Sequence, residues 1–267
     1  MGTAQPAVQE APAPVRISRR AGSSPYVLVC DHASNFIPGQ FGTLGLAQAE
    51  LTRHIAWDPG ALPVARLMAQ ALDATLVESC ISRLIIDCNR PLDAPDLISP
   101  VSETTAVPGN AGLSEAARQE RIALSWQPFH GAIDEVVAQR LAEGRETRLV
   151  SVHSFTRVYR SIERPWHIGV IHDEDARLAA PIISALGGVV GLEVGVNQPY
   201  SPADRVYYTL ERHGRARGLA CAMIEIRNDE IADEASQHKW AELLSMILAG
   251  VKLSPDALPA TTTRQAR

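Results

Sequence analysis

Short apolar runs rich in valine, isoleucine and leucine recur along this chain and alternate with longer amphipathic stretches. Apolar runs of this length are typical of strands that helices cover on both faces. The pattern predicts an α/β fold of three layers, with a mixed, mostly parallel sheet flanked by helices. The strands are expected at 26–30, 75–77, 84–88, 148–153, 167–171, 192–194 and 220–226.

The stretches between these runs predict helices at 58–72, 114–144, 201–213 and 229–250. Asp58 followed by Pro59 has the form of an N-cap and a first helical position. Pro128 is expected to break the second helix, because proline lacks the amide hydrogen that the helix needs. Residues 201–204 have the form of a capping box that opens the third helix.

Both ends of the chain are poor in residues that could build a core. Residues 1–20 are rich in proline and alanine, and residues 253–267 are polar and interrupted by proline, so both are expected to be disordered tails. Residues 21–252 are long enough for a single α/β domain, which is the expected organisation.

Composition and charge exclude several classes of partner. The net charge of −5 comes from 25 basic and 30 acidic residues scattered along the chain, so no nucleic-acid footprint is expected. The sequence has no run of 18 apolar residues, so no membrane span is expected. The N-terminus lacks the apolar segment that is typical of a secretory signal. The four cysteines lack CxxC spacing. We therefore expect a cytoplasmic protein, monomer or homodimer, that acts on a small molecule.

Polar residues follow four of the apolar runs, and ligands of open α/β sheets bind where the strands end. These residues are Asp31 and His32, the segment 87–90, His153 with Ser154, and the segment 225–228. Catalytic zinc needs neutral imidazoles, an anionic oxygen and one open position. His32 and His153 are the candidate ligands, and the alternative for each is a hydrogen bond to backbone at a strand end. The other histidines are expected to pack or to lie on the surface.

Two further candidates follow from charge placed near apolar runs. A carboxylate without a task would be costly to bury where Glu225 stands, so a base beside a metal-bound water is one interpretation and a salt bridge with Arg227 is the other. Arg90, with Asn89, offers a donor fork that matches a substrate carboxylate. Arg83 is a weaker candidate that points either toward the same cluster or toward solvent.

Six ordered motifs carry a family resemblance that runs from about Tyr26 to about Gly250. They are VLVCDHASNFIP, HIAWDPGA, SRLIIDCNRP, SVHSFT, VGVNQPYS and IEIRND. Together they resemble the N-formylglutamate amidohydrolase family, which is similar to the zinc carboxypeptidases and aspartoacylases. The resemblance implies a zinc-carboxypeptidase-like (phosphorylase/hydrolase-like) fold with one Zn²⁺ ion, in whose place another divalent metal could stand. It also implies hydrolysis of the amide of an N-formyl or other short N-acyl acidic amino acid, above all N-formyl-L-glutamate in histidine degradation.

The resemblance also assigns roles to individual residues. His32 and His153 match the two histidine ligands, Asn89 and Arg90 match a clamp on the substrate carboxylate, and Glu225 matches the general base. Two residues of VNQPYS, Asn197 and Tyr200, would line the substrate pocket, and Tyr200 could donate a hydrogen bond to the developing oxyanion. Arg83 and Arg227, from two of the other motifs, complete the set of candidates for substrate binding.

The chain departs from the carboxypeptidase pattern His-x-x-Glu, because the third residue after His32 is Asn35, a poor zinc ligand. Asp58 is the candidate third ligand, against its alternative role as a helix N-cap. Asp31 could orient a ligand imidazole. Two other functions stay open. One is a deacylase or carboxypeptidase-like hydrolase of different acyl preference, and the other is an inactive relative that binds a metal or ligand.

Overall fold

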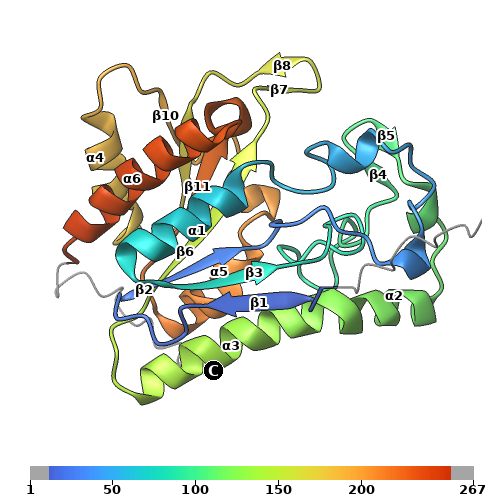
Figure 1. Cartoon of the computed structure of the whole chain (residues 1–267), viewed down its shortest axis with the longest axis horizontal. Helices are drawn as coiled ribbons and strands as arrows, with labels where there is room; N and C mark the ends of the chain where they lie inside the picture. The colour runs from blue at the N-terminus through green and yellow to red at the C-terminus, as the bar shows by residue number, and fades with distance from the viewer. Residues whose placement is uncertain (1–11, 254–267) are drawn as a thin grey trace, which may run out of the picture.

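Seven strands form one mixed sheet in the computed structural model, which describes residues 12–253 (Figure 1). Four of the six strand pairings are parallel, and β1 and the pair β9 and β10 run opposite to the rest. The expected mixed, mostly parallel sheet is therefore confirmed. In spatial order the strands are β1 (Val15–Ser18), β3 (Thr75–Ser79), β2 (Tyr26–Cys30), β6 (Arg148–Phe155), β11 (Cys221–Arg227), β9 (Ile168–Ile171) and β10 (Val194–Val196).

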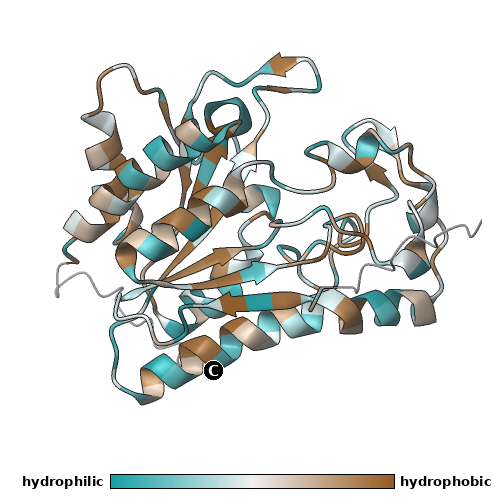
Figure 2. Cartoon of the chain, in the orientation of Figure 1, coloured by the Kyte–Doolittle hydropathy of each residue, from teal (hydrophilic) through white to brown (hydrophobic). Residues whose placement is uncertain are grey.

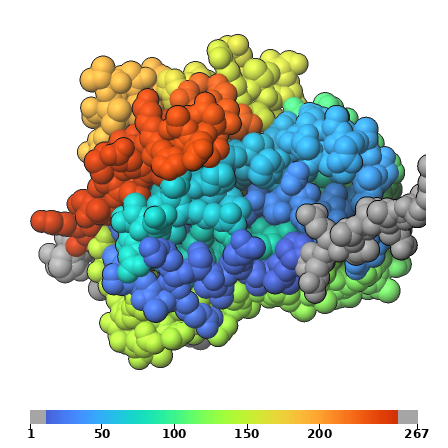
Figure 3. Space-filling model, viewed as in Figure 1, coloured from blue at the N-terminus to red at the C-terminus, as the bar shows by residue number. Residues whose placement is uncertain are grey.

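Helices cover both faces of the sheet. On one face lie α1 (Ala61–Leu72), α4 (Ala179–Gly187) and α6 (Glu234–Gly250), and α1 packs against α6. On the other face lie α3 (Gln127–Ala142) and α5 (Tyr208–His213). The first layer is continuous in the space-filling view, where α6 and α1 adjoin (Figure 3).

Alternate residues of each central strand supply the two cores, because successive side chains of a strand point to opposite faces. In β2, Leu28 packs with α1 and α6, whereas Val27 and Val29 pack with α3. These strands are buried along their whole length and carry apolar residues on both faces, as their brown colour shows (Figure 2). Burial on both faces explains why they read as continuous apolar runs.

A third apolar cluster lies outside the sheet and corrects one predicted strand. Residues 84–88 do not form a strand, and Leu84, Ile85 and Ile86 are instead buried among the loops. The cluster also takes Trp126 from the helical layer. Apolar content alone does not separate a buried strand from a buried loop, which is why the prediction was wrong.

The helix starts also differ from expectation. The N-cap position of α1 is Gly60, which has a φ of 80°, so the prediction that Asp58 caps this helix was wrong. Helix α2 (Glu115–Arg121) passes into α3 through a π-helical turn, Ile122–Trp126, rather than a break at Pro128. The capping box at 201–204 is present but opens only a single 3-10 turn, Pro202–Asp204. The remaining short elements are the 3-10 turns Gly39–Phe41, Glu50–Thr52, Pro108–Asn110, Arg215–Arg217 and Asn228–Ile231, and the hairpins β4 (Val101–Ser102) with β5 (Thr105–Ala106) and β7 (Val158–Tyr159) with β8 (Ile162–Glu163).

The N-terminal boundary of the predicted domain was also wrong. Part of the expected tail 1–20 forms β1, which pairs antiparallel with β3 along Val15–Ser18. Leu253, which the expected C-terminal tail includes, packs partly against the core. The rest of both expected tails, residues 1–11 and 254–267, lies outside the described residues. Within the described part of the chain, no helix is both long and apolar enough to cross a membrane.

Gly169 of β9 allows the segment after β10 to approach the sheet. A Cβ atom at this position would overlap the backbone carbonyl oxygen of Gln198. We expect Gly169→Ala to lower the free energy of unfolding by about 1 to 3 kcal/mol, because the backbone must shift to relieve the overlap. Gly131 in α3 is the control: it has open space around it, so Gly131→Ala should raise stability by up to about 1 kcal/mol. Urea denaturation compares them, and equal effects would contradict the expectation.

Candidate active site

A cavity of about 150 Å³ opens where β2, β6 and β11 end. These three strands are parallel neighbours, so the residues at their carboxyl ends meet at one edge of the sheet. The cavity wall includes His32, Asp58, His153, Tyr200 and Glu225. The strand order thus brings together residues that lie up to about 190 positions apart in the sequence.

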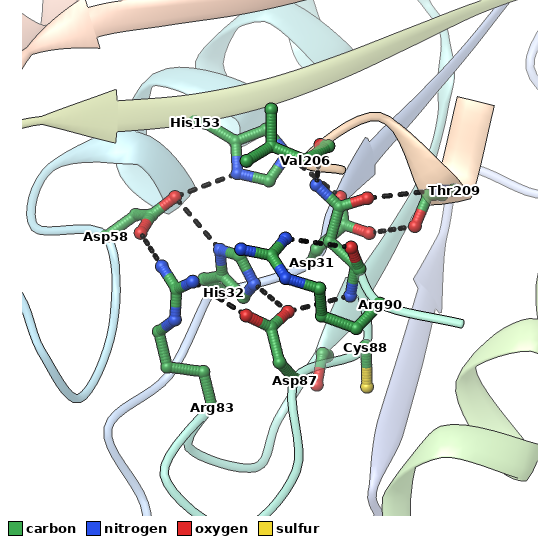
Figure 4. Close-up of polar contacts among 12 residues, drawn as sticks. Asp31, His32, Asp58, Arg83, Asp87, Cys88, Arg90, His153, Val206 and Thr209 are labelled. Carbon is green, nitrogen blue, oxygen red and sulfur yellow. Dashed lines mark hydrogen bonds and ion pairs between the residues drawn. The ribbon is translucent and has the colours of Figure 1, made fainter. Parts of the chain in front are cut away.

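Two imidazoles converge on one carboxylate at the base of this cavity (Figure 4). Asp58 Oδ2 lies 3.3 Å from His32 Nδ1 and 2.9 Å from His153 Nδ1. All three residues are buried, and one potential ligand atom from each lies within 4.8 Å of the others. The structure thus brings together the three residues that the sequence offers as metal ligands, His32, Asp58 and His153.

The far side of each imidazole faces another carboxylate. His32 Nε2 lies 2.7 Å from Asp87 Oδ1, and His153 Nε2 lies 3.1 Å from Asp31 Oδ2. A carboxylate only accepts hydrogen bonds, so a neutral imidazole with carboxylates on both sides can satisfy only one of them. With the proton on Nε2, each Nδ1 presents its lone pair to Asp58. Three electron-rich atoms then face one another at the cluster, which requires either added protons or a cation between them.

The titration of the histidines shows the same need for positive charge. Burial lowers the pKa of His153, but its contacts with Asp31 and Asp58 outweigh burial and raise the pKa well above its usual value. For His32, burial and Arg83 lower the pKa, and the charges of Asp87 and Asp58 more than offset them. The cluster therefore favours a cation, whether that is a proton or a metal ion.

Arg83 joins the two carboxylates that flank His32. Its guanidinium lies 3.4 Å from Asp58 Oδ1 and donates to Asp87 Oδ2 at 2.7 Å. These charges outweigh burial and raise the pKa of Arg83. Arg83 thus points into the cluster and away from its other predicted direction, the solvent.

Glu225 lies next to His153 on the neighbouring strand. Their Cα atoms are partners in the parallel pairing of β6 and β11, so both side chains leave the same face of the sheet. Glu225 is 4% exposed, and its Oε2 finds no hydrogen-bond partner within residues 12–253. Burial raises its pKa to about 7. A carboxyl that titrates near neutral pH can both take up and release a proton, as a general base requires.

Arg227 takes no part in this arrangement. Its guanidinium donates to Asp229 at 2.7 Å and to Glu230 at 2.8 Å, and also to backbone carbonyls of the β8–β9 connection. The alternative interpretation of Glu225, a salt bridge with Arg227, was therefore wrong. Arg227 does not line the cavity, so the geometry does not support its predicted contact with substrate.

Asn89 and Arg90 reach the cavity wall from a loop rather than from a strand end. The Asn89 side chain is already engaged, since its amide nitrogen donates to Val206 O and its oxygen accepts from the Thr209 amide at 3.0 Å. Arg90 Nε donates to Asp96 at 2.8 Å and Nη1 donates to Asn89 O at 3.1 Å. Of this pair, Arg90 is the group that keeps donor capacity for an anion.

Tyr200 and Asn197 separate in the structure although they belong to one motif. The Tyr200 hydroxyl accepts from Arg164 Nη1 at 3.1 Å and its side chain lines the cavity. Burial and the charge of Glu225 raise the pKa of Tyr200, which keeps the phenol protonated and able to donate. Asn197 does not line the cavity, and its side-chain oxygen accepts from the His172 amide at 2.9 Å. Asn35 is likewise remote, donating to Leu51 O at 2.9 Å.

Several residues at the site were not predicted from the sequence. Asp87, which carries no predicted role, holds His32. Asp31, which the sequence offers as a residue that orients a ligand imidazole, lies against His153 rather than against its sequence neighbour His32. His54, Glu103 and Tyr159 line the cavity from loops and hairpins. Only Asp87 carried a signal, because it adjoins the Asn89–Arg90 motif. A second cavity of about 330 Å³ shares Arg83, Arg90 and several other wall residues with the first.

Comparison with known proteins agrees with the fold and identifies the family. The model of the family described as N-formylglutamate amidohydrolase matches residues 24–232. A crystal structure of a gene product from Agrobacterium tumefaciens superposes with a TM-score of 0.88 at 43% identity, covering 90% of this chain and 94% of that one. The crystal structure of N-formylglutamate amidohydrolase from Ralstonia eutropha JMP134 gives a TM-score of 0.66 at 20% identity, covering 88% and 96%. No curated protein matches this chain.

A mixed α/β sheet with a buried acid–base cluster at its strand ends, together with these matches, defines a hydrolase that acts on a small molecule. The chain belongs to the N-formylglutamate amidohydrolase family.

The raised pKa of Glu225 makes the stability of the metal-free protein depend on pH. Its folded pKa of about 7 exceeds the ordinary 4.5, so its contribution is fully present below pH 4.5 and is lost as the pH rises to 7. Glu225→Gln escapes this loss, so with a chelator present it should be more stable than the wild type above pH 7. The expected difference is about 3 kcal/mol, at about 1.4 kcal/mol per pH unit over that window.

Denaturation at pH 4.5 and pH 8 measures this difference. The matched control is Glu242→Gln at an exposed position of α6, which should follow the wild type at both values. A constant gap between Glu225→Gln and the wild type would contradict the assigned titration.

Proposed function

We propose that this protein is a zinc-dependent amidohydrolase that removes a formyl or other short acyl group from an acidic amino acid. The substrate proposed first is N-formyl-L-glutamate, which would yield formate and L-glutamate. The observation that carries the proposal is the convergence of His32, Asp58 and His153 beside the unpartnered carboxyl of Glu225. The same proposal includes that the fold is zinc-carboxypeptidase-like.

The three converging residues suit a zinc ion. Two imidazole nitrogens and one carboxylate oxygen are a common ligand set for catalytic zinc, which keeps a further position open. Asp31 and Asp87 would fix the ring orientation of the two ligands through their Nε2 atoms. When bound, a zinc ion supplies Lewis-acid chemistry that polarises an acyl oxygen and makes water more acidic.

Glu225 supplies the proton transfers of the proposed reaction. As a carboxylate it takes a proton from the attacking water, and as a carboxylic acid it returns a proton to the leaving nitrogen. Because its Oε2 has no hydrogen-bond partner among residues 12–253, no contact of that oxygen with these residues has to be broken before either step. The protonated Tyr200 hydroxyl stands on the same wall, where it can donate to the developing oxyanion.

Arg90 would hold the carboxylate next to the scissile amide. Arg90 lines the cavity wall, and within residues 12–253 its one ion pair is with Asp96, whose side chain is 48% exposed. A charge-assisted hydrogen bond to substrate is worth about 1.5 to 3 kcal/mol. This interaction selects amino-acid substrates over simple amides.

A hydrolase of wider acyl preference is the second candidate, and the adjoining cavity of about 330 Å³ favours it, because a larger substituent could extend there. Turnover of formyl-, acetyl- and succinyl-glutamate separates the two. An inactive relative is disfavoured by Glu225, since a buried carboxyl without a partner is costly unless it has a task.

We expect Glu225→Gln to keep bound zinc and to lose about 10²- to 10⁴-fold in kcat, the range for losing a general base. Metal analysis and formate release measure the two properties. Asp58→Asn is the complementary variant, expected to lose zinc as well as activity. Turnover of Glu225→Gln near that of the wild type would remove Glu225 from the mechanism, and full activity after chelation would refute zinc dependence.

We expect Arg90→Met to raise KM for N-formyl-L-glutamate by about 10- to 100-fold, since the charge-assisted bond is worth about 1.5 to 3 kcal/mol and each 1.4 kcal/mol is tenfold. The control is Arg20→Met, which breaks an exposed pair with Glu135 and should leave steady-state kinetics unchanged. An unchanged KM in the Arg90 variant would show that the carboxylate binds elsewhere.

A further inference from the structure

The peptide that carries Asn89 and Arg90 is held from behind by two side chains of one helical segment. His130 Nε2 lies 2.9 Å from the carbonyl oxygen of Cys88, and Trp126 Nε1 donates to the carbonyl oxygen of Arg90 at 3.0 Å. The two contacts therefore grip the backbone on either side of Asn89. His130 and Trp126 are four positions apart, one helical turn, and their rings lie 4.1 Å apart.

The proton on His130 can be placed from its partners. The Cys88 carbonyl only accepts a hydrogen bond, so His130 Nε2 must donate. The other nitrogen, Nδ1, lies 2.7 Å from His213 Nε2 in α5, and both rings are almost fully buried. A neutral His130 must accept there, so His213 donates from Nε2. One histidine thus sets the tautomer of the other.

The remaining nitrogen of the pair, His213 Nδ1, lies 3.0 Å from Asp134 Oδ1 of α3. Burial lowers the pKa of His130 to about 3 and of His213 to about 4, so both rings are neutral near pH 7. Arg212 and Arg217 already pair with Asp134, whose side chain is 36% exposed. When both rings are neutral, the contact between His213 Nδ1 and Asp134 is the one that lacks a proton. It lies at the end of this hydrogen-bonded series where the Asp134 carboxylate meets water, and the buried contact of His130 with Cys88 stays paired.

The local fold around Trp126 and Arg90 makes the position of Arg90 depend on these backbone contacts. Trp126 is the last residue of the π-helical turn Ile122–Trp126, and such turns shift the face that a helix presents. Within the part of the chain that the structure describes, the Arg90 guanidinium is anchored by the half-exposed Asp96 and by the carbonyl of Asn89. The position of Arg90 therefore depends chiefly on its backbone, which the helix fixes.

We propose that His130 and Trp126 are positioning residues that hold Arg90 in place for the substrate carboxylate, with His213 holding His130 in the donating tautomer. The inference rests on the proposed function, in which Arg90 binds the carboxylate beside the scissile amide. Small misplacements of a substrate-positioning group lower binding and turnover strongly, so support of this kind has a measurable effect.

The experiment compares variants that keep the rings and change the donors, using the zinc-loaded full-length protein and N-formyl-L-glutamate. His130→Phe removes the donor and keeps a flat ring, Trp126→Phe removes only the indole donor, and His130→Gln restores an amide donor close to Nε2. We expect each Phe variant to raise KM about 5- to 10-fold with kcat within about 3-fold of the wild type. His130→Gln should recover most of that loss.

Asp134→Asn is the matched control. Its amide can donate to His213 Nδ1, which leaves the contact with Cys88 intact, so its KM should equal that of the wild type. A second readout uses N-formyl-L-glutamate with the α-carboxylate replaced by an amide. Because Arg90 has no anion to hold in this compound, the Phe variants should leave its KM unchanged.

A purely structural role would lower thermal stability without separating KM from kcat or one substrate from the other. The inference is overturned if both Phe variants leave KM within twofold while Arg90→Met raises it, or if they impair both substrates equally. If Arg90→Met itself leaves KM unchanged, the carboxylate clamp of the proposed function fails as well. Should His130→Phe not fold, Trp126→Phe and His130→Gln make the same comparison.

Discussion

The buried contact of Asp58 with two imidazoles is the constraint around which the site is organised. A carboxylate at this depth needs positive charge close by, and among the described residues His32, His153 and Arg83 can supply it. Each of the two imidazoles is held by a further carboxylate, Asp87 or Asp31. The cluster therefore has more negative than positive groups until a cation joins it.

The strand order of the sheet places the residues of this cluster next to one another. Asp31 and His32 directly follow the end of β2, β6 carries His153 close to its end, and β11 places Glu225 beside His153 by parallel pairing. Apolar packing on both faces keeps these strands in register, so the distance between ligands and base is set by backbone hydrogen bonds. The proposed substrate side is built differently, because Arg90 lies on a loop that is held by His130 of α3 and by Trp126 of the π-helical turn before it.

Much of the site could be predicted from polar residues that end apolar runs. This reasoning located His32, His153 and Glu225, because strand ends in an open α/β sheet converge. The same reasoning fails where apolar residues fill a loop, as at 84–88. It also misses β1, whose sequence VRIS is not a continuous apolar run. Arg227 and Asn197 were selected from motifs, and their side chains turn to local backbone and carboxylate partners. A motif fixes the order of residues but not the direction of each side chain.

The sequence by itself determined the α/β class and singled out His32, His153, Glu225 and Arg90 as candidates, since periodicity and residue chemistry are local properties of the chain. Only the tertiary structure excluded the N-cap role of Asp58, because Gly60 caps helix α1 and the Asp58 side chain contacts the imidazoles instead. The partnership of His32 with Asp87, of His153 with Asp31 and of His130 with His213 was also decided there. These contacts join residues from separate elements, and such pairings depend on strand order and layer packing, which local sequence does not encode.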